Sequence, residues 1–585
     1  MKNKMLFSVL LISVFISCNT NKNDTAANAD ADKSFKEFEN RFMDAFWKQN
    51  PSWAIYAGYG KYYDSLKIPD SAAFAGDILF AKNELDSLQQ FNASTLSPNN
   101  KIDFLILQNQ LKASIWYADT FKIQEWDPSG YNIGGECNEI ITQQYAPLNT
   151  RLTDLSAHLK NVPLYYTAAL KMIHQPTKEH TDLAILQNKG SLDVFGASLT
   201  DSINASTLDA AQRDTLKQRI NAATAAIKNY CGDLKKILAD KNYQFRKYQI
   251  GDTLFNQKFK YDIVTDYTAK EIFDKAMATK KTYHEKMFLL CGEMWSKYFP
   301  AVTMPADTLQ TIKMMIDKIA LNHVSPAHLV DTLKSHIHQL QYFIKQKDLF
   351  AYDTSSPLQV RIMPAYMSGS SLASASGTGP YAKKPIAYYN ITDLSKSPAD
   401  KAESQLREYN NYTLQILSIH EGMPGHCMQG AYSNKSSSIV KSVFGNGAMI
   451  EGWAVYCQKM MLENGWANNS SEMQLMFYKW SLRECSNVLI DYGIQCLNWQ
   501  KDDVIKLLKK ETFQEDAQIE EKYHRATISQ VQLCSYFTGS TEIFDLREAY
   551  KTKTGNAYSL KDFHEKFLSY GSAPVKYIRE LMMEK

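Results

Sequence analysis

This 585-residue chain has little net charge, no closely spaced cysteine pair and no apolar run long enough to cross a membrane. Its 65 basic and 62 acidic residues leave a formal charge of +3, which gives no electrostatic footprint for nucleic acid. The nine cysteines include no C-x-x-C pair, and a chain of this size does not need disulfide bonds to hold its fold. Most cysteines are therefore expected to be small, buried, apolar residues.

Hydrophobic and aromatic residues are what the chain has in quantity. A hydrophobic share of 44% with 22% charged residues is ordinary for a globular protein, and the length allows a large core or several domains. The 34 Tyr, 27 Phe and 9 Trp residues indicate aromatic packing in the core and in grooves. A substrate cleft lined by tyrosines is the alternative interpretation.

The first eighteen residues, MKNKMLFSVLLISVFISC, are typical of an export signal. After a basic start, their apolar run is shorter than the roughly 20 residues that span a bilayer. Residues 1–18 look like a lipoprotein signal peptide. Cleavage before Cys18 would make this cysteine the first residue, and its sulfur would carry a lipid. Phe15 stands where such signals usually carry Leu, so an ordinary secretory signal is the alternative.

Both signals export the protein, and the lipid would be its only contact with a membrane. We expect a bacterial lipoprotein, anchored to the outer membrane and facing the periplasm. The following stretch, 19–34, is polar and predicts a disordered tether.

Helical periodicity covers nearly all of the remaining chain, so the predicted fold is mostly α. Three segments show apolar residues at three- and four-residue intervals most clearly: 35–50, 216–240 and 269–299. Helical periodicity returns at about Ala399, directly after Pro398, and continues to the C-terminus.

One small β element interrupts the helices, near residues 357–391. PLQVRIMPAYM (357–367) and KPIAYYNI (384–391) are rich in β-branched and aromatic residues and predict two short strands. The Gly/Ser-rich stretch SGSSLASASGTG (368–379) between them predicts a flexible loop.

The change of pattern near residue 350 is the one candidate domain boundary. It would separate an N-terminal helical part, 35–350, from a C-terminal helical part, 351–585, that carries the motifs described next. The alternative is one continuous domain, 35–585.

The string HEGMPGH resembles a zinc-peptidase motif with altered spacing, because His420 and His426 are six residues apart. On a regular helix, residues i and i+6 differ by about 120°, so the two imidazoles could not share a metal. Pro424 removes one helical N–H and Gly425 tolerates unusual backbone angles. The helix must therefore be distorted here, and such a distortion can bring the two histidines together.

Glu451 is the candidate third ligand, because a catalytic zinc commonly has three protein ligands and one open position. It stands alone in the apolar stretch GNGAMIEGWAVYCQKMM (445–461), where a buried carboxylate needs a cation or good hydrogen bonds. Pairing with an arginine or capping a helix is the alternative for Glu451, and a structural role is the alternative for each histidine. Together with Glu421, the set favours metal binding.

These motifs resemble a bacterial family catalogued as domain of unknown function 885. HEGMPGHCMQ (420–429) and EGWAVY (451–456) match the family's two central motifs, and the likeness covers about residues 37–583. The supporting matches are QNPSWAIYAGYGKYYD (49–64), LRECSNVLIDYGIQ (482–495), RATISQVQLCSYFTG (525–539), DLRE (545–548) and DFHEKFLSYGSAP (562–574).

The resemblance implies a mostly helical zinc-peptidase-like fold, related in logic to the gluzincins. It places one Zn²⁺ per chain on His420, His426 and Glu451, and makes Glu421 the general base of peptide hydrolysis. Dipeptidyl peptidase III, with one residue inserted in its His-Glu motif, is a precedent for altered spacing. The chain departs from the family at Gln495 and at Gln530–Gln532, outside the metal set, so these changes concern substrate preference.

The tetrahedral oxyanion of peptide hydrolysis needs a hydrogen-bond donor besides the metal. Tyr536 and Arg525 are the favoured candidates because family motifs meet there. His524 and Gln532 in the same region are candidate substrate-binding residues, and Tyr523 is a further possible donor.

The predicted strand 384–391 is the candidate for peptide binding, because an extended substrate can pair with a strand edge. Tyr388 and Tyr389 would supply side-chain contacts, and alternation along a strand lets at most one of them face the substrate. The alternative is that both are core aromatics. The glycine-rich loop beside the strand is a candidate lid.

A protein of another class also fits part of the sequence. A lipid-anchored lipoprotein that captures glycans or peptides would explain the tether and the tyrosines, but not Glu421 and Glu451. A catalytically degenerate peptidase is a further alternative. Peptide length, exo- or endopeptidase action and oligomeric state stay open.

Overall fold

The computed structural model describes residues 20–351, 357–364, 367 and 372–584. Its first half contains α1 (Thr20–Gln49), α2 (Pro51–Ala57), α3 (Ser71–Leu88), α4 (Pro98–Trp116), α5 (Ile123–Trp126), α6 (Gly134–Thr142), α7 (Leu148–Leu159), α8 (Val162–Met172), α9 (Lys178–Ser191), α10 (Ala197–Ala205), α11 (Ala210–Ala239), α12 (Gly251–Asp262), α13 (Ala269–Tyr298), α14 (Thr308–Ile319) and α15 (Leu329–Gln346).

The second half contains β1 (Leu358–Ile362), β2 (Ala373–Gly377), β3 (Ala387–Ile391), α16 (Ala399–Glu408), α17 (Thr413–Leu417), α18 (His426–Ser433), α19 (Ile439–Val443), α20 (Gly447–Glu463), α21 (Ser471–Cys496), α22 (Lys501–Lys506), α23 (Asp516–Ile528), α24 (Cys534–Thr554), α25 (Leu560–Ser569) and α26 (Val575–Met583). The fold is mostly α with one three-stranded sheet, as the sequence predicts.

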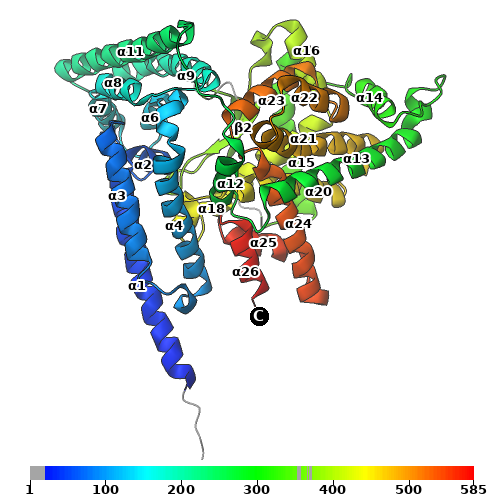
Figure 1. The fold of residues 1–585 in the computed structure, drawn as a ribbon, viewed down its shortest axis with the longest axis horizontal. Helices are drawn as coiled ribbons and strands as arrows, with labels where there is room; N and C mark the ends of the chain where they lie inside the picture. Colours follow the sequence, from blue (N-terminus) through cyan, green and yellow to red (C-terminus); the bar gives the residue numbers. More distant parts are fainter. Residues whose placement is uncertain (1–19, 352–356, 365–366, 368–371, 585) are drawn as a thin grey trace, which may run out of the picture.

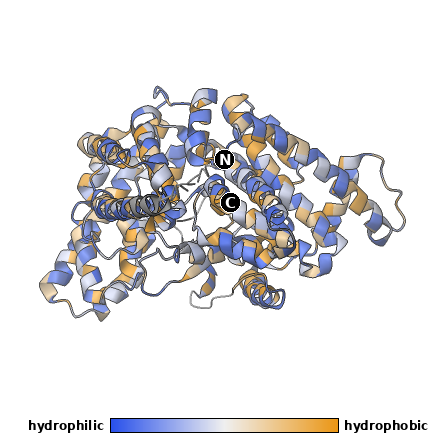
Figure 2. Cartoon of the chain, turned by 90° about the horizontal axis from the view of Figure 1, so that it is seen from below, coloured by the Kyte–Doolittle hydropathy of each residue, from blue (hydrophilic) through white to orange (hydrophobic). Residues whose placement is uncertain are grey.

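The helices form two groups that meet across a shared core (Figure 1). The early helices up to α11 lie on one side, and α20 to α26 fill the centre, with α13 and α14 at the opposite edge. Most helices carry both hydrophilic and hydrophobic residues, as expected for amphipathic helices with one buried face (Figure 2). Among the described residues, no helix is long and apolar enough to cross a membrane.

The largest core cluster draws residues from both sides of the candidate boundary at residue 350. Phe35 and Phe42 of α1 belong to it together with Leu333 of α15 and Trp453 of α20. Phe42 and Phe444 also pack ring against ring, with centroids 6.2 Å apart. The change of sequence pattern near residue 350 therefore marks the β element rather than a division between two separate cores.

Helix α1 begins earlier than the sequence predicts, at Thr20, so residues 20–34 are helical rather than a disordered tether. The stretch is rich in alanine, the best helix former. Asp32 also holds it in place, because its carboxylate accepts hydrogen bonds from Ser97 N at 2.9 Å and Asn100 Nδ2 at 2.7 Å. The predicted signal peptide and its lipidation residue, Cys18, lie outside the described residues.

The sheet has three strands in the order β1-β3-β2, one more than the sequence predicts. β1 pairs with β3 in parallel and β2 pairs with β3 in antiparallel register. β2 forms inside the stretch predicted as a flexible loop, where Asn390 Nδ2 of β3 donates to Ser376 Oγ at 3.0 Å and to the Ser374 carbonyl oxygen at 3.2 Å. Cross-strand pairing here overrides the low strand propensity of Gly and Ser.

The order of the strands also corrects the prediction that a peptide pairs with the strand at 384–391. The stretch 384–391 contains β3, which is the central strand, so both of its edges are already paired. The outer strands are β1 and β2. A substrate strand can add to an outer strand but not to β3.

Other sequence expectations are confirmed. The three clearest periodic segments lie in α1, α11 and α13, and α16 begins at Ala399 after Pro398. All eight cysteines of the described residues are unpaired, and only Cys496 among them is not fully buried.

Candidate metal centre

The distortion predicted between the two histidines is present. α17 passes into one π-helical turn, η8 (Ser418–Gly422), which carries His420; a cis Met423–Pro424 peptide and Gly425 follow before α18 begins at His426. Gly425 N donates to the Ile419 carbonyl oxygen at 3.0 Å. A Cβ at Gly425 would collide with the carbonyl oxygens of Ile419 and His420, so the turn requires glycine.

Glu451 is positioned by the close packing of α20 against α24. Asn446 caps α20 by accepting from Met449 N at 2.8 Å. Gly452, the neighbour of Glu451, packs directly on the backbone of Gly539 in α24, and a Cβ on either glycine would collide with the opposite helix. The two glycines thus let α20 approach α24 and fix where Glu451 enters the site.

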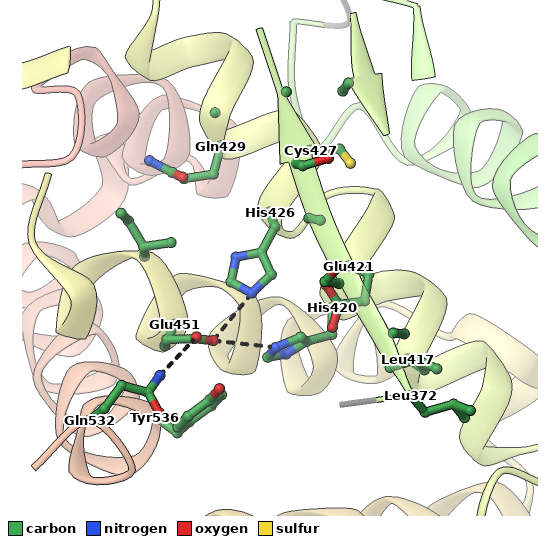
Figure 3. Close-up of a pocket in the computed structure, with 18 of the residues that line it drawn as sticks. Leu372, Leu417, His420, Glu421, His426, Cys427, Gln429, Glu451, Gln532 and Tyr536 are labelled. Carbon is green, nitrogen blue, oxygen red and sulfur yellow. Dashed lines mark hydrogen bonds and ion pairs between the residues drawn. The ribbon is translucent and has the colours of Figure 1, made fainter. Parts of the chain in front are cut away.

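His420, His426 and Glu451 converge on one point, as Figure 3 shows. Glu451 Oε2 lies 3.5 Å from His420 Nε2 and 3.2 Å from His426 Nε2, and the three candidate ligand atoms all lie within 4.8 Å of one another. Two ligand atoms at usual zinc distances on a tetrahedral ion are roughly 3.3 Å apart. The spacing therefore fits a tetrahedral metal.

The unsatisfied atoms of this cluster also fit a metal. Glu451 Oε2 is buried and has no hydrogen-bond partner among the described residues, and its nearest polar neighbours are the two imidazole nitrogens. A buried carboxylate oxygen without a donor is costly unless a cation faces it. His and Glu side chains are the donors that zinc accepts, so the residues present fit this ion.

The charges of the three groups depend strongly on one another. Burial raises the pKa of Glu451, but His426 and His420 outweigh it and hold that pKa well below its usual value. Burial lowers the pKa of His426, and the Glu451 carboxylate reverses this so that the net pKa is raised. The cluster thus stabilises positive charge at its centre, whether carried by a proton or by a metal ion.

A second layer of hydrogen bonds orients His420. The Gln458 amide satisfies its neighbours when its oxygen faces the two ring N–H groups. In this orientation Gln458 Oε1 accepts from His420 Nδ1 at 2.8 Å and from Trp480 Nε1 at 3.1 Å. Gln458 Nε2 then donates to Glu484 Oε1 at 2.9 Å. This hydrogen bond places a proton on His420 Nδ1, so that Nε2 presents a lone pair to the centre, the arrangement that suits a histidine metal ligand.

Tyr536 and Arg525 lie beside the metal cluster, as the sequence predicts. The Tyr536 ring stacks on His420, with centroids 6.2 Å apart and planes 14° from parallel. Arg525 Nη2 donates to Tyr536 Oη at 2.7 Å and to Gln532 Oε1 at 2.8 Å. Gln532 Nε2 in turn points to Glu451 Oε1 at 3.5 Å. Burial raises the pKa of Tyr536 to about 12, so its hydroxyl keeps its proton at neutral pH.

A cavity of about 720 Å³ opens onto these residues. The catalytic candidate Glu421 lines it, together with the metal set and with the β2 segment Ala373–Gly377. The Glu421 carboxylate forms no hydrogen bond or ion pair within the described part of the chain, so it is free to act on a ligand.

Three predicted substrate contacts do not line this cavity. Tyr389 is fully buried because β3 is the central strand, and Tyr388 lies under the Arg361 guanidinium, 3.6 Å from its ring centroid. The cavity wall includes the start of β3 but neither tyrosine. His524 also lies outside the lining, on another face of α23 from Arg525. Gln532 is the one predicted substrate contact that reaches the cavity.

The sequence interpretation missed a charged wall of the cavity, formed by Trp480, Arg483, Glu484, Asn487, Glu521 and Lys522. Four of these residues lie on α21 at positions separated by three or four residues, so they share one helical face. Polar residues at that spacing inside an otherwise apolar helix are the signal by which the wall could have been found.

Comparisons with known proteins agree with this fold. A solved candidate lipoprotein of unknown function from Shewanella oneidensis is 43% identical, with a TM-score of 0.81 over 94% of this chain and 100% of its own. A candidate lipoprotein from Colwellia psychrerythraea has a TM-score of 0.76 over 94% and 98% of the two chains, and at 14% identity it shows the fold alone. No curated protein matches the chain. The model of a family described as "Bacterial protein of unknown function (DUF885)" matches residues 51–582, so the chain belongs to this family.

Proposed function

We propose that this protein is an exported, zinc-dependent peptidase with a gluzincin-like site. The observation that carries the proposal is the buried Glu451 Oε2, which faces two imidazole nitrogens at 3.2 and 3.5 Å and has no hydrogen-bond donor among the described residues. This arrangement supports a three-ligand zinc site with an open position for a reacting group.

His420, His426 and Glu451 would hold the ion. When bound, zinc supplies Lewis acidity, which polarises a carbonyl oxygen and acidifies water. The Gln458–Glu484 hydrogen bond supports the ligand geometry, because it orients the Gln458 amide whose oxygen accepts from His420 Nδ1.

Glu421 would act as the general base. Its carboxylate follows the ligand His420 in sequence and lines the cavity. In hydrolysis, Glu421 accepts a proton from the attacking water, the water oxygen bonds to the peptide carbonyl carbon, and the C–N bond breaks. Glu421 then passes the proton to the departing amine, so water is the only co-reactant.

Tyr536 would stabilise the oxyanion. Arg525 donates to the Tyr536 oxygen, which leaves the hydroxyl proton of Tyr536 available for a second acceptor. A phenol whose pKa is raised to about 12 by burial remains a donor at neutral pH. Such a preorganised donor stabilises charge that develops on the carbonyl oxygen.

The peptide would lie along the edge of β2 that faces away from β3, over residues 374–377. β2 lines the cavity, and among the described strands it pairs with β3 alone. Backbone hydrogen bonds to a strand edge bind a peptide with little dependence on its side chains.

We also propose export and anchoring through a lipid on Cys18, at the outer membrane and facing the periplasm. The lipoprotein-like signal of residues 1–18 supports this location, and both structural relatives are described as candidate lipoproteins.

Metal analysis combined with a peptidase assay tests the proposal. Protein purified without chelators should contain about one zinc per chain. A strong chelator should abolish hydrolysis of a mixed peptide library, and added zinc should restore it. Protein that stays metal-free after zinc addition would contradict the metal site, and zinc-loaded protein that cleaves no peptide would contradict the activity.

A further inference from the structure

We propose that Lys522, on the cavity wall beside Arg525, binds the C-terminal carboxylate of short peptide substrates, so that the enzyme acts near free C-termini. This inference rests on the peptidase activity proposed above. It assigns a substrate class, peptides with a free α-carboxylate, and a substrate-binding residue outside the metal cluster.

Lys522 is a buried basic side chain that forms no ion pair with any described residue. Its side chain lines the cavity and is only 6% exposed. Lys522 Nζ donates to Asn487 Oδ1 at 2.7 Å and to the Arg483 carbonyl oxygen at 3.4 Å, and both of these acceptors are neutral. Within the described part of the chain, Lys522 forms no ion pair, which is unusual for a buried lysine.

The neighbouring carboxylates have other partners. Glu408 binds Lys479 Nζ at 2.7 Å and Arg483 Nη1 at 3.0 Å. Glu484 accepts from the Gln458 amide, and Glu521 accepts from Gln405 Nε2 at 3.5 Å. No carboxylate of the described residues therefore lies within ion-pair distance of Lys522.

The pKa of Lys522 indicates that the carboxylates near it do not compensate for its burial. Burial lowers the pKa of Lys522 well below its usual value, and the neighbouring Arg483 and Arg525 lower it further, while Glu408 and Glu521 raise it by less. Burial raises the pKa of Glu484 to about 8, against the effects of Lys522 and Arg483. A ligand carboxylate placed here would stabilise the protonated lysine, and the lysine would in turn bind it strongly.

Arg525 adds a second cation on the same helical face. Lys522 and Arg525 are three residues apart on α23, about 4.5 Å along the helix axis. Arg525 makes its two hydrogen bonds to the neutral Gln532 and Tyr536 and forms no ion pair with any described residue. The two side chains thus form a basic strip that runs from Tyr536, beside the candidate metal ligands, along the cavity wall.

The position of this strip indicates which anion binds there. Arg525 contacts Tyr536 and Lys522 lies one helical turn away on α23, so an anion at Lys522 lies within the reach of a short peptide whose carbonyl contacts Tyr536. A cavity of about 720 Å³ has the size of sites that enclose small ligands, which suits a short peptide. The α-carboxylate is the one anion that every such peptide carries at its end, whatever its side chains.

Three versions of one peptide test the proposal: the free acid, the C-terminal amide and the N-acetylated free acid. With zinc-loaded wild-type protein, we expect kcat/KM for the free acid to exceed that for the amide by about ten- to hundred-fold, the effect of one charge-assisted hydrogen bond. N-acetylation should change kcat/KM less than amidation does.

Variants then connect this preference to Lys522. In Lys522→Met the acid-to-amide ratio should fall to about two or less, through slower hydrolysis of the acid, with zinc content unchanged. Lys501→Gln is the matched control. It removes an exposed lysine of α22 that pairs with Glu520 of α23, the helix that carries Lys522, and it should keep the wild-type ratio. The ratio is measured within one preparation, so partial misfolding cancels.

Asn487→Ala provides a second variant if Lys522→Met does not fold. It keeps the charge but removes the side-chain acceptor that orients Lys522, and the ratio should fall by several-fold. Wild-type protein that cleaves the acid and the amide equally, or that responds only to N-acetylation, would overturn this inference while leaving the peptidase proposal intact. Zinc-loaded protein that cleaves none of the three peptides would instead overturn the peptidase proposal itself.

Discussion

Glu408 and Glu451 each lie between two basic side chains in the C-terminal half of the molecule, but only one of them is satisfied. The Glu408 carboxylate forms ion pairs with Lys479 at 2.7 Å and Arg483 at 3.0 Å, and it accepts a hydrogen bond from the backbone N–H of Glu515 at 3.1 Å. Glu451 faces His420 and His426, and its Oε2 has no hydrogen bond among the described residues.

The difference lies in which basic groups face each carboxylate. Lys479 and Arg483 form direct ion pairs with Glu408, so they complete its cluster without an added ligand. Burial raises the pKa of Glu408, but Lys479 and Arg483 outweigh it and keep the carboxylate ionised. In the Glu451 cluster the basic groups are imidazoles, and the carboxylate raises the pKa of His426. The Glu451 cluster therefore stabilises an added positive charge, whereas the Glu408 cluster already contains its ion-pair partners.

The largest effect on turnover is expected at Glu421, whose carboxylate has no hydrogen bond or ion pair with any described residue. Glu421→Gln should lower kcat for peptide hydrolysis by about 10²–10⁴-fold, because an amide cannot accept the proton of the attacking water. Zinc content and unfolding midpoint should match the wild type, and Glu451→Gln serves as the contrasting variant that loses zinc. Hydrolysis at the wild-type rate by Glu421→Gln would exclude Glu421 as the base.

Stability should separate the two clusters directly. Glu408→Gln leaves Lys479 and Arg483 buried without an anion and should reduce the free energy of unfolding by about 3–5 kcal/mol. Glu451→Gln should cost less than about 1 kcal/mol in chelator-treated protein, because the histidines can become neutral. Denaturant unfolding of both variants in the presence of chelator measures the contrast. Equal losses would remove the distinction between them.

The oxyanion donor gives a smaller expected effect on turnover. Tyr536→Phe should lower kcat by about 10²–10³-fold while zinc binding and KM stay near wild-type values, because only the developing charge loses its donor. Tyr550→Phe, on the same helix α24, is the matched control and should change kcat less than about twofold. An unchanged kcat in Tyr536→Phe would transfer the role to another donor, with Arg525 next to be tested.

The smallest effect concerns the layer behind the metal ligands. Gln458→Leu removes the acceptor that fixes His420 Nδ1 and should weaken zinc affinity by about 10–100-fold. Competition with a chelator of known affinity measures this change. Gln474→Leu on α21, where the amide donates only to the Asn469 backbone, should leave the affinity unchanged. Equal affinities in all three proteins would show that Gln458 does not position the ligand.

The convergence of His420, His426 and Glu451 was predictable because its signals are local. Pro424 and Gly425 between the histidines already require a distorted helix, and Glu451 stands alone among apolar residues. The glycine at 425 proves necessary because the chain passes against the carbonyl oxygens of Ile419 and His420. Tyr536, Arg525 and Gln532 also lie at the site, although their sequence positions are more than 70 residues beyond Glu451.

The predicted substrate strand was wrong in its position within the sheet, because strand order is not a local property. Tyr388 and Tyr389 have strong strand propensity, which indicated β3 but gave no information on its neighbours. β2 was interpreted as a loop because Gly and Ser rarely form strands alone, and its pairing depends on hydrogen bonds from Asn390. The early start of α1 has a similar cause, since Asp32 is held by residues of another segment.

By itself, the sequence determined the helical character of the chain and the identity of the residues that converge on the candidate metal centre, since periodicity, helix breakers and lone buried acids act over a few residues. Only the tertiary structure decided which strand edge faces the cavity and which carboxylates are satisfied. It also decided that Lys522 lines the cavity without a counter-ion. These properties depend on side chains brought together from distant helices, where the free energy of a buried charge depends on every neighbour it has.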